Sequence, residues 1–353
     1  MEQHAVLDLR HFHMPAEWHR HAGTLLTWPH RPAIWRGIHA EVELTFAKLA
    51  AELSEVESVH ISVPDLAWQR RAEKLVVNAG ANSSSLVWHF IDSDDVWARD
   101  HGPIFVVQRD RIHGDEPQLA MIDWDFNAWG GKFESKLDNL IPRRLNETLA
   151  VPRVQPGIVM EGGSLEVNGC GDLLTTEAVL LNTNRNPHLT RDQIEQSLTL
   201  HLGVERLHWL GSGLEGDDTD GHIDDIARFV AEDSIVIVSA PPGHADYAAM
   251  HQNQQRVRSF RDRQGRPFQV HVLPTPEPIS FAGEHLPASY ANFYIANEKV
   301  IVPTFDQASD VQALELIQSL LPDRRVVGLD GRSLVSQYGN FHCITQQIPE
   351  VAR

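Results

Sequence analysis

The sequence is poor in cysteine, in basic residues and in long apolar runs. Two cysteines are too few for a disulfide scaffold, and the first residues lack the features of a secretory signal, so we expect a reducing cytoplasm. No window approaches the roughly 18 apolar residues of a membrane-spanning helix. Lysine and arginine number 30 against 48 aspartates and glutamates, for a formal net charge of −18. That balance disfavours a nucleic-acid or membrane partner and favours a cationic substrate, although acidity also serves solubility.

Complete metal and nucleotide motifs are missing as well. His11 with His13, or His19 with His21, could share a metal, but no acid or cysteine set completes such a site, and surface or satisfied histidines are the better interpretation. GSGLEG at 211–216 has dinucleotide-type glycines but is followed by acidic residues, which repel phosphate. The same acidic stretch lacks the end carboxylates of a calcium loop. We therefore expect no cofactor.

Hydrophobic periodicity predicts the α/β class. Helical patterns span residues 38–56, 65–79, 135–149, 190–202, 244–262 and 309–321, with short β-rich runs between them. Capping boxes are predicted at Thr190 with Gln193 and at Ser309 with Gln312. SLEVNGCGDLLT is typical of a hairpin, with Cys170 exposed near its tip. No linker-like stretch divides the chain, so we predict one domain over residues 1–353.

A loose repeat runs along the chain: a polar segment, an apolar strand, often a turn, and a second apolar strand. Five polar markers are spaced by 61, 61, 70 and 51 residues, namely Asp100, Glu161, His222, Asn292 and Cys343. This spacing fits five units of strands plus a helix, arranged radially with the polar segments near one axis. Ordinary α/β alternation without symmetry is the simpler alternative.

Two polar stretches suit a planar cation. VWARDHGP places Trp97 and Asp100 before a Gly-Pro break, so they fit a loop where a ring stacks on a cation and a carboxylate grips its edge. A packed tryptophan with a buried pair between Arg99 and an aspartate is the alternative. In TDGHIDD, His222 and Asp224 are two residues apart and would share one face of a strand, although most such pairs lie on surfaces.

Three further stretches could each contribute to an active site or have a purely structural role. MEGGSLE holds Glu161 before two glycines, either turned inward or in a plain turn. WDFNAWGGK offers Phe126, Trp129 and Lys132 as a substrate rim or a packed turn. FHCITQQIP holds Cys343 beside a histidine, as a nucleophile or a buried spacer.

Taken together, these groups do not resemble a thiol protease, which gains nothing from many carboxylates. Several acids around one thiol suit a cationic electrophile instead. The thiolate would attack a carbon held by carboxylates, and a histidine would protonate the leaving amine. A guanidinium fits, because its planar fork matches paired carboxylates.

The ordered motifs resemble one known family. They are MPAEW, TWPH, VWARDHGP, FNAWGGK, EGGSLEVNGCGDLLTTEAVLLNTNRNP, TDGHIDDIARF, SYANFYIAN, VIVPTFD and GNFHCITQQIP. The chain is similar over residues 14–349 to the agmatine deiminase and Porphyromonas-type peptidylarginine deiminase family of the guanidino-modifying (pentein) superfamily. This resemblance implies a five-bladed α/β propeller of ββαβ-like units. It also implies hydrolysis of a guanidino group to a ureido group and ammonia, without metal or organic cofactor.

The resemblance also implies residue roles. Cys343 would be the nucleophile, and His222 the general acid and base. Asp100 and Asp224 would grip the guanidinium, and Glu161 would support His222 or the substrate. The predicted substrate contacts are completed by Trp97, Trp129 and Asp220.

Agmatine is the leading substrate, because it is a small dication and the chain is acidic. Peptidylarginine is the runner-up, and a non-catalytic propeller that binds guanidino or polyamine ligands is a third alternative. Two departures from the family pattern bear on this choice. Gln337-Tyr338-Gly339-Asn340 replaces a run of glycines, and aspartate stands at 220 and 225 where well-studied agmatine enzymes tend to have asparagine. Assembly into a homo-oligomer is left open.

Overall fold

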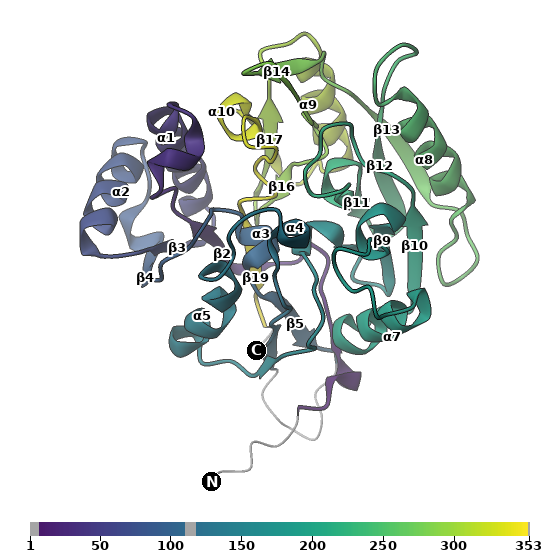
Figure 1. Ribbon diagram of the computed structural model, residues 1–353, viewed down its shortest axis with the longest axis horizontal. Coiled ribbons are helices and arrows are strands. Elements are labelled where there is room, and N and C mark those ends of the chain that lie inside the picture. The colour runs from purple at the N-terminus through teal and green to yellow at the C-terminus, as the bar shows by residue number, and fades with distance from the viewer. Residues whose placement is uncertain (1–6, 110–117, 352–353) are drawn as a thin grey trace.

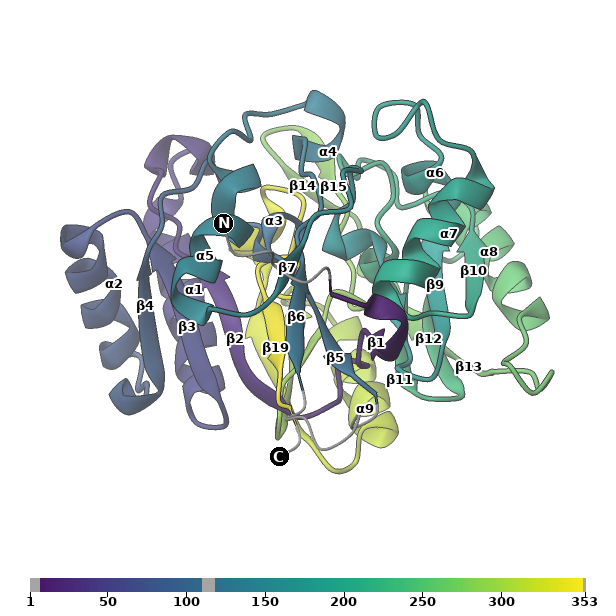
Figure 2. The ribbon, with the colours of Figure 1, turned by 90° about the horizontal axis from the view of Figure 1, so that it is seen from below.

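The computed structural model describes residues 7–109 and 118–351, and the predicted α/β class is confirmed. Figures 1 and 2 show the long helices on the outside of the molecule and the strands toward its middle. These helices are α1 (His39–Ser54), α2 (Leu66–Asn78), α5 (Ile141–Leu149), α7 (Arg191–Leu202), α8 (Tyr247–Ser259) and α9 (Ser309–Leu320). None of the helices in the described part of the chain is long and apolar enough to cross a membrane.

Within the described ranges the strands form five sheets of three or four strands and one separate hairpin. The four-stranded sheets are β19 (Gln346–Pro349), β2 (His21–Thr27), β3 (Ser58–Val63), β4 (Leu86–Phe90); and β1 (Phe12–His13), β5 (Ile104–Gln108), β6 (Leu119–Ile122), β7 (Arg153–Val154). The three-stranded sheets are β8 (Glu166–Val167), β9 (Asp172–Thr176), β10 (Arg206–Leu210); β11 (Ala227–Ala231), β12 (Ser234–Ser239), β13 (Gln269–Pro274); and β16 (Tyr294–Ile295), β17 (Lys299–Thr304), β18 (Arg325–Asp330). The hairpin pairs β14 (Ile279–Phe281) with β15 (Glu284–Leu286).

One strand pattern recurs in these five sheets. An antiparallel pair is followed by a parallel pair, and a long helix connects the two parallel strands, as β8, β9, α7 and β10 illustrate. A parallel pair needs such a crossover, whereas antiparallel neighbours need only a turn. The same order is found in β11–β12–α8–β13 and β16–β17–α9–β18.

The five polar markers occupy equivalent places in these sheets. Each lies in the turn that directly precedes an antiparallel strand: Asp100 in α3 (Ala98–His101) before β5, Glu161 at η5 (Gly162–Ser164) before β8, His222 at η6 (Ile223–Asp225) before β11, Asn292 before β16, and Cys343 before β19. The repeated strand pattern therefore presents one polar turn per sheet.

The last strand completes the first sheet. β19 pairs antiparallel with β2, with Gln346 opposite Leu25, so the last strand of the described chain lies beside a strand from its first thirty residues (Figure 2). This pairing fixes the turn that carries Cys343. A second anchor is a backbone hydrogen bond from Arg99 N to Cys343 O of 3.0 Å.

Two local predictions need correction. The helix predicted over 135–149 begins only at Ile141, after the short 3-10 turn η4 (Asp138–Leu140), because Pro142 suits a first helical turn and not an interior. The capping box at Ser309 is wrong. The N-cap is Ala308, and the Ser309 hydroxyl instead lies 2.8 Å from the Tyr290 hydroxyl. The capping box at Thr190 is confirmed.

The other predicted helices are confirmed to within a few residues at each end. The NGCG hairpin is also confirmed between β8 and β9, and Cys170 at its turn is partly exposed. Shorter helical turns are η1 (Leu9–His11), η2 (Pro32–Trp35), η3 (Ser83–Ser85), α4 (Ala128–Gly131), α6 (Glu177–Leu180) and α10 (Arg332–Val335).

Candidate active site

Cys343 lies buried where the polar turns meet, with 5% of its surface exposed. Asn292 clamps it from the neighbouring turn. The Asn292 amide nitrogen is 3.0 Å from Cys343 Sγ, and its Oδ1 accepts the backbone N–H groups of His342 at 3.0 Å and Cys343 at 3.3 Å. Asn292, which precedes β16, therefore fixes the thiol and the backbone of the turn before β19, which belongs to another sheet.

Negative charge surrounds this thiol. Burial raises the pKa of Cys343 well above its usual value, and the carboxylates of Asp224, Asp225 and Asp100 raise it further. Cys343 Sγ lies 3.6 Å from Asp224 Oδ2. The cysteine is thus a thiol in the free protein, and a bound cation would favour its ionisation.

His222 is fully buried and neutral. Burial lowers its pKa to about 3, and neither ring nitrogen has a hydrogen-bond partner among the residues that the structure describes. Its Nδ1 is 3.7 Å from Asp100 Oδ1, and its Nε2 is 4.0 Å from Glu161 Oε2. A neutral imidazole with no fixed partner can accept a proton and return it.

Gly163 makes this arrangement possible. A Cβ atom at that position would lie 2.4 Å from His222 Nδ1 and 2.8 Å from Asp100 Oδ1, both too close for a side chain. The Gly163 N–H instead donates to Asp100 Oδ1 at 2.9 Å. The second glycine of MEGG is therefore required by close approach of the backbone to two site residues.

Asp100 is held by neutral donors alone. Besides Gly163, the Trp129 indole donates from Nε1 to Asp100 Oδ2 at 3.0 Å. Burial raises the pKa of Asp100 well above its usual value, and the charges of Asp224 and Glu161 add to the shift.

Asp224 has a different environment. Its Oδ2 is 2.6 Å from His342 Nδ1, whereas its Oδ1 is buried without a partner. Burial alone would raise the pKa of Asp224, but the hydrogen bond and positive charge of His342 outweigh it and lower the pKa. An unpaired buried carboxylate oxygen calls for a ligand that donates to it.

Glu161 is held through an arginine. Arg185 donates from Nε to Glu161 Oε1 at 2.6 Å, and Oε2 is buried without a partner. Arg185 also contacts Asp220 Oδ2 at 2.6 Å, while Lys132 contacts Asp220 Oδ1 at 2.7 Å. Both oxygens of Asp220 thus have partners from the protein itself, so its geometry fits a support for Arg185. Its predicted contact with substrate stays a prediction.

A cavity of about 430 Å³ opens beside this centre. Trp97 and Trp129 form part of its wall. The charged residues that line it are four acids and one base, which is 3.3 Å from the first of these acids: Asp94, Asp95, Glu134, Asp218 and Arg31. Burial raises the pKa of Asp95 to about 6 and that of Asp218 to about 7. The ring of Phe126 packs at 5.3 Å, edge to face, behind Trp129. Among the residues of the WDFNAWGGK loop, Trp129 is thus the one at the rim, and Lys132 instead supports Asp220.

Within residues 7–109 and 118–351, one group of side chains has ligand atoms close enough for a metal ion. Asp224, Asp225 and Cys343 each offer an atom within 4.8 Å of the others. Cys343 is also the thiol that would react, and Asp225 Oδ1 already accepts a hydrogen bond from the Asn292 amide at 3.0 Å. Their negative charge serves an organic cation as well as a metal.

The structure brings together eight of the predicted positions and adds four that the sequence prediction missed. Cys343, His222, Asp224, Asp100 and Glu161 form the buried centre, Trp97 and Trp129 its mouth, and Asp220 its outer support. The missed residues are Asn292, His342, Arg185 and Glu17. Asn292 is one of the five repeat markers, and Glu17 lies in the MPAEW motif. The sequence therefore marked both positions but did not indicate what either side chain does.

Comparison with known proteins decides the family. A family model described as Porphyromonas-type peptidyl-arginine deiminase matches residues 13–349. The chain belongs to this family. It is 37% identical to an agmatine deiminase of Medicago truncatula, over 96% of this chain and 97% of the relative. As a member of the family it is an enzyme that hydrolyses the C=N bond of a guanidino group.

Solved structures agree with the family assignment. The agmatine deiminase of Enterococcus faecalis matches with a TM-score of 0.89 at 32% identity, covering 97% of both chains. A cysteine-to-serine variant of the C. jejuni agmatine deiminase, solved with substrate bound, matches with a TM-score of 0.87 at 28% identity over 97% of both chains. The fold of this family member is therefore that of the deiminases.

Proposed function

We propose that the protein hydrolyses agmatine to N-carbamoylputrescine and ammonia. The observation that carries this proposal is the unpaired oxygens of Asp224 and Glu161 beside a buried thiol and a neutral histidine. Buried acceptors without donors cost free energy, and a guanidinium supplies several N–H donors in one plane. Asp100 and Asp224 then hold the guanidinium while Cys343 faces its central carbon.

The reaction runs in two halves. As the cation binds, the Cys343 thiol gives its proton to His222, and the thiolate attacks the guanidinium carbon to form a tetrahedral adduct. The C–N bond breaks as His222 passes that proton to the leaving nitrogen, which departs as ammonia. An amidino-thioether remains. His222 then takes a proton from water, and the hydroxide attacks the same carbon. The C–S bond breaks, the hydroxyl proton is lost to solvent, and His222 returns its proton to the Cys343 thiolate as the neutral ureido product departs.

The mouth of the site favours agmatine. Beyond the guanidinium, agmatine carries an ammonium on a short alkyl chain, and the cavity combines tryptophan walls with acidic side chains, among them Asp218. This combination stabilises a chain that ends in a second cation. Peptidylarginine is the alternative, and the description of the family model favours it. That substrate would place an uncharged backbone among the acids.

The decisive test is a side-by-side assay of ureido product from agmatine, free arginine and an arginine-containing peptide. We expect turnover of agmatine. Cys343→Ala should abolish it, because the nucleophile is gone, while agmatine binding measured by calorimetry persists. Cys170→Ala is the matched control, since the partly exposed hairpin cysteine lies outside the site, and it should keep full activity. Turnover of the peptide but not of agmatine, or activity in Cys343→Ala, would contradict the proposal.

The five sheets are also best described as blades of one propeller in a single domain. The recurring strand pattern, the polar turn in each sheet and the pairing of β19 with β2 support this arrangement. In Figure 1 the sheets are arranged around the short helix α3, and this arrangement supports the proposal. A single cooperative unfolding transition, seen alike by fluorescence and circular dichroism, is expected for one domain.

A further inference from the structure

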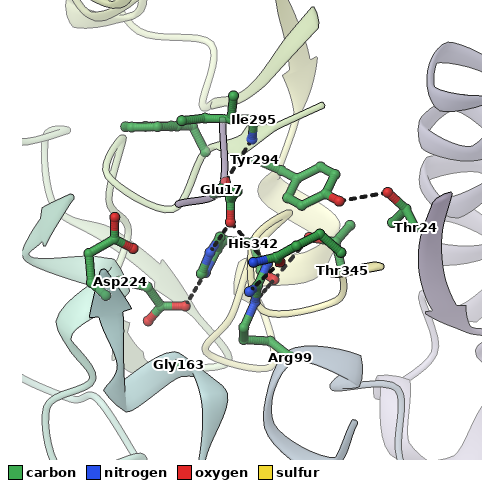
Figure 3. A network of polar contacts seen from close by, with 12 residues as sticks. Glu17, Thr24, Arg99, Gly163, Asp224, Tyr294, Ile295, His342 and Thr345 are labelled. Atoms are coloured by element: carbon green, nitrogen blue, oxygen red, sulfur yellow. Dashed lines mark hydrogen bonds and ion pairs between the residues drawn. The ribbon is translucent and has the colours of Figure 1, made fainter. Parts of the chain in front are cut away.

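His342 directly precedes the nucleophile in the sequence but faces away from the mouth of the site. Its Nδ1 is 2.6 Å from Asp224 Oδ2, and its Nε2 is 2.8 Å from Glu17 Oε2. Figure 3 shows the ring between these two carboxylates. All three side chains are buried. A neutral imidazole has one N–H and would turn a lone pair toward one of the carboxylates, whereas an imidazolium donates to both.

Glu17 is ionised in this setting. Its Oε1 accepts from Arg228 at 2.9 Å and from the Ile295 N–H at 2.8 Å, and its Oε2 accepts from Arg99 at 3.1 Å as well as from His342. Burial opposes the charge, but Arg228 and His342 outweigh burial and hold the pKa of Glu17 well below its usual value. A carboxylate with four donors has no place for a proton of its own.

The charges of the residues bonded around Glu17 balance only when His342 carries one. Burial raises the pKa of Glu166, but both its oxygens accept hydrogen bonds, from Arg228 Nε at 2.7 Å and from the Phe229 N–H at 2.9 Å, so the geometry favours a third carboxylate beside those of Glu17 and Asp224. Two buried arginines, Arg99 and Arg228, face these three acids. With a neutral His342 the interior would hold one uncompensated negative charge, which is costly away from water.

We infer that His342 is held as an imidazolium between Glu17 and Asp224, and that it positions the Asp224 carboxylate for the substrate. The ring occupies Oδ2 and leaves Oδ1 free, and its charge keeps Asp224 ionised beside two other acids. His342 touches no reacting atom, so it is a positioning residue for the deimination proposed above.

The charged state is tested directly in the free protein. Nitrogen-15 NMR of selectively labelled histidine distinguishes an imidazolium from a neutral ring, and His342→Gln identifies the signal by its loss. We expect both His342 nitrogens to carry protons at neutral pH, because each faces a carboxylate oxygen. A neutral ring at neutral pH would overturn the inference. This measurement needs no turnover, so it stands apart from the proposed agmatine activity, which the wild-type assay tests.

The positioning role is tested by kinetics. His342→Gln should lower kcat/KM for agmatine by about ten- to a hundred-fold, the range for losing a hydrogen bond to a charged group. Without the cation the pKa of Asp224 rises, so the decline of kcat/KM on the acid side should move to higher pH. Glu17→Gln should shift it in the same direction by a smaller amount. Besides Glu17, the titratable and charged groups around Asp224 and His342 are Arg99, Arg228, Glu166, His222, Cys343, Asp100, Asp217 and Asp225.

His89→Gln is the matched control. His89 is also buried and bonded at both ring nitrogens, to His60 and Thr148, but it lies in β4, outside the site. It should keep the wild-type pH profile. If His342→Gln unfolds, Glu17→Gln and the NMR measurement still decide the question. An unshifted pH profile in a folded His342→Gln or Glu17→Gln protein would overturn the positioning role.

Discussion

Asp100 and Asp224 face the same buried centre, yet their surroundings shift their pKa values in opposite directions. Asp224 rests against a histidine with an ionic network behind it, and its pKa is lowered. Asp100 rests against an indole and a backbone amide, and its pKa is raised well above the usual range. The difference indicates a division of labour: Asp224 is charged before substrate arrives, whereas Asp100 becomes charged when the substrate supplies a cation.

Neutralising each aspartate separately gives the largest contrast. Asp224→Asn should lower kcat/KM for agmatine by about 10²- to 10³-fold, because it leaves the His342 cation with Glu17 as its one bonded carboxylate and removes the charged partner of the guanidinium. Asp100→Asn should cost about ten- to a hundred-fold, since the amide resembles the protonated acid already present. Steady-state kinetics measures both. Equal losses, or a greater loss at Asp100, would break the comparison.

Binding of substrate should release a proton from Asp100. Its raised pKa means that the free protein holds this proton at neutral pH, and a guanidinium in contact reverses that preference. Calorimetry of agmatine with Cys343→Ala, in buffers of different ionisation enthalpy, should show release of about one proton from Asp100. The double variant with Asp100→Asn should lose this part of the signal, whereas adding Asp224→Asn should not.

The raised pKa also fixes how Asp100 contributes to stability. The folded protein binds the Asp100 proton more tightly than the unfolded chain does. The resulting contribution to the free energy of unfolding is fully present below the ordinary pKa of about 3.9 and is lost as the pH rises through the raised value. The same Asp100→Asn variant should flatten this part of the pH dependence in urea titrations.

Trp129→Phe should have the smallest effect. It removes one hydrogen bond to Asp100 without removing the aromatic wall, so kcat/KM for agmatine should fall about five-fold, as for a bond of about 1 kcal/mol. Trp124→Phe is the control, because that buried indole has no hydrogen-bond partner and lies outside the site. A change at Trp124 as large as that at Trp129 would assign the effect to packing instead.

The residues proposed to face the substrate could be predicted from the sequence, whereas the charged residues behind them could not. Cys343, His222 and Asp100 each stand in a short polar motif before an apolar strand. Such a pattern lies within a few neighbouring residues, so it can be recognised in the sequence alone. His342 and Glu17 are 325 residues apart, and their contact depends on the meeting of the first and last parts of the described chain. No local pattern reports such a contact.

The contacts of Asp220 with Arg185 and Lys132 could not be predicted from the sequence for a different reason. Its backbone has a φ of +74°, which glycine adopts readily and aspartate only in a supporting environment. That geometry turns the carboxylate toward Arg185 and Lys132. The dense acidic stretch predicts contact with a cationic substrate, whereas the cations that contact Asp220 in the structure belong to the protein.

The pairing of β19 with β2 has a consequence for the biosynthesis of the enzyme. Cys343 follows Glu17, Asp100, His222 and Asn292 in the chain, so a ribosome makes every wall of the site before it makes the nucleophile. A growing chain up to residue 340 would hold the carboxylates and the histidine but no thiol at its centre. The thiol of the site is thus absent from the nascent protein until the residues just before β19 are made.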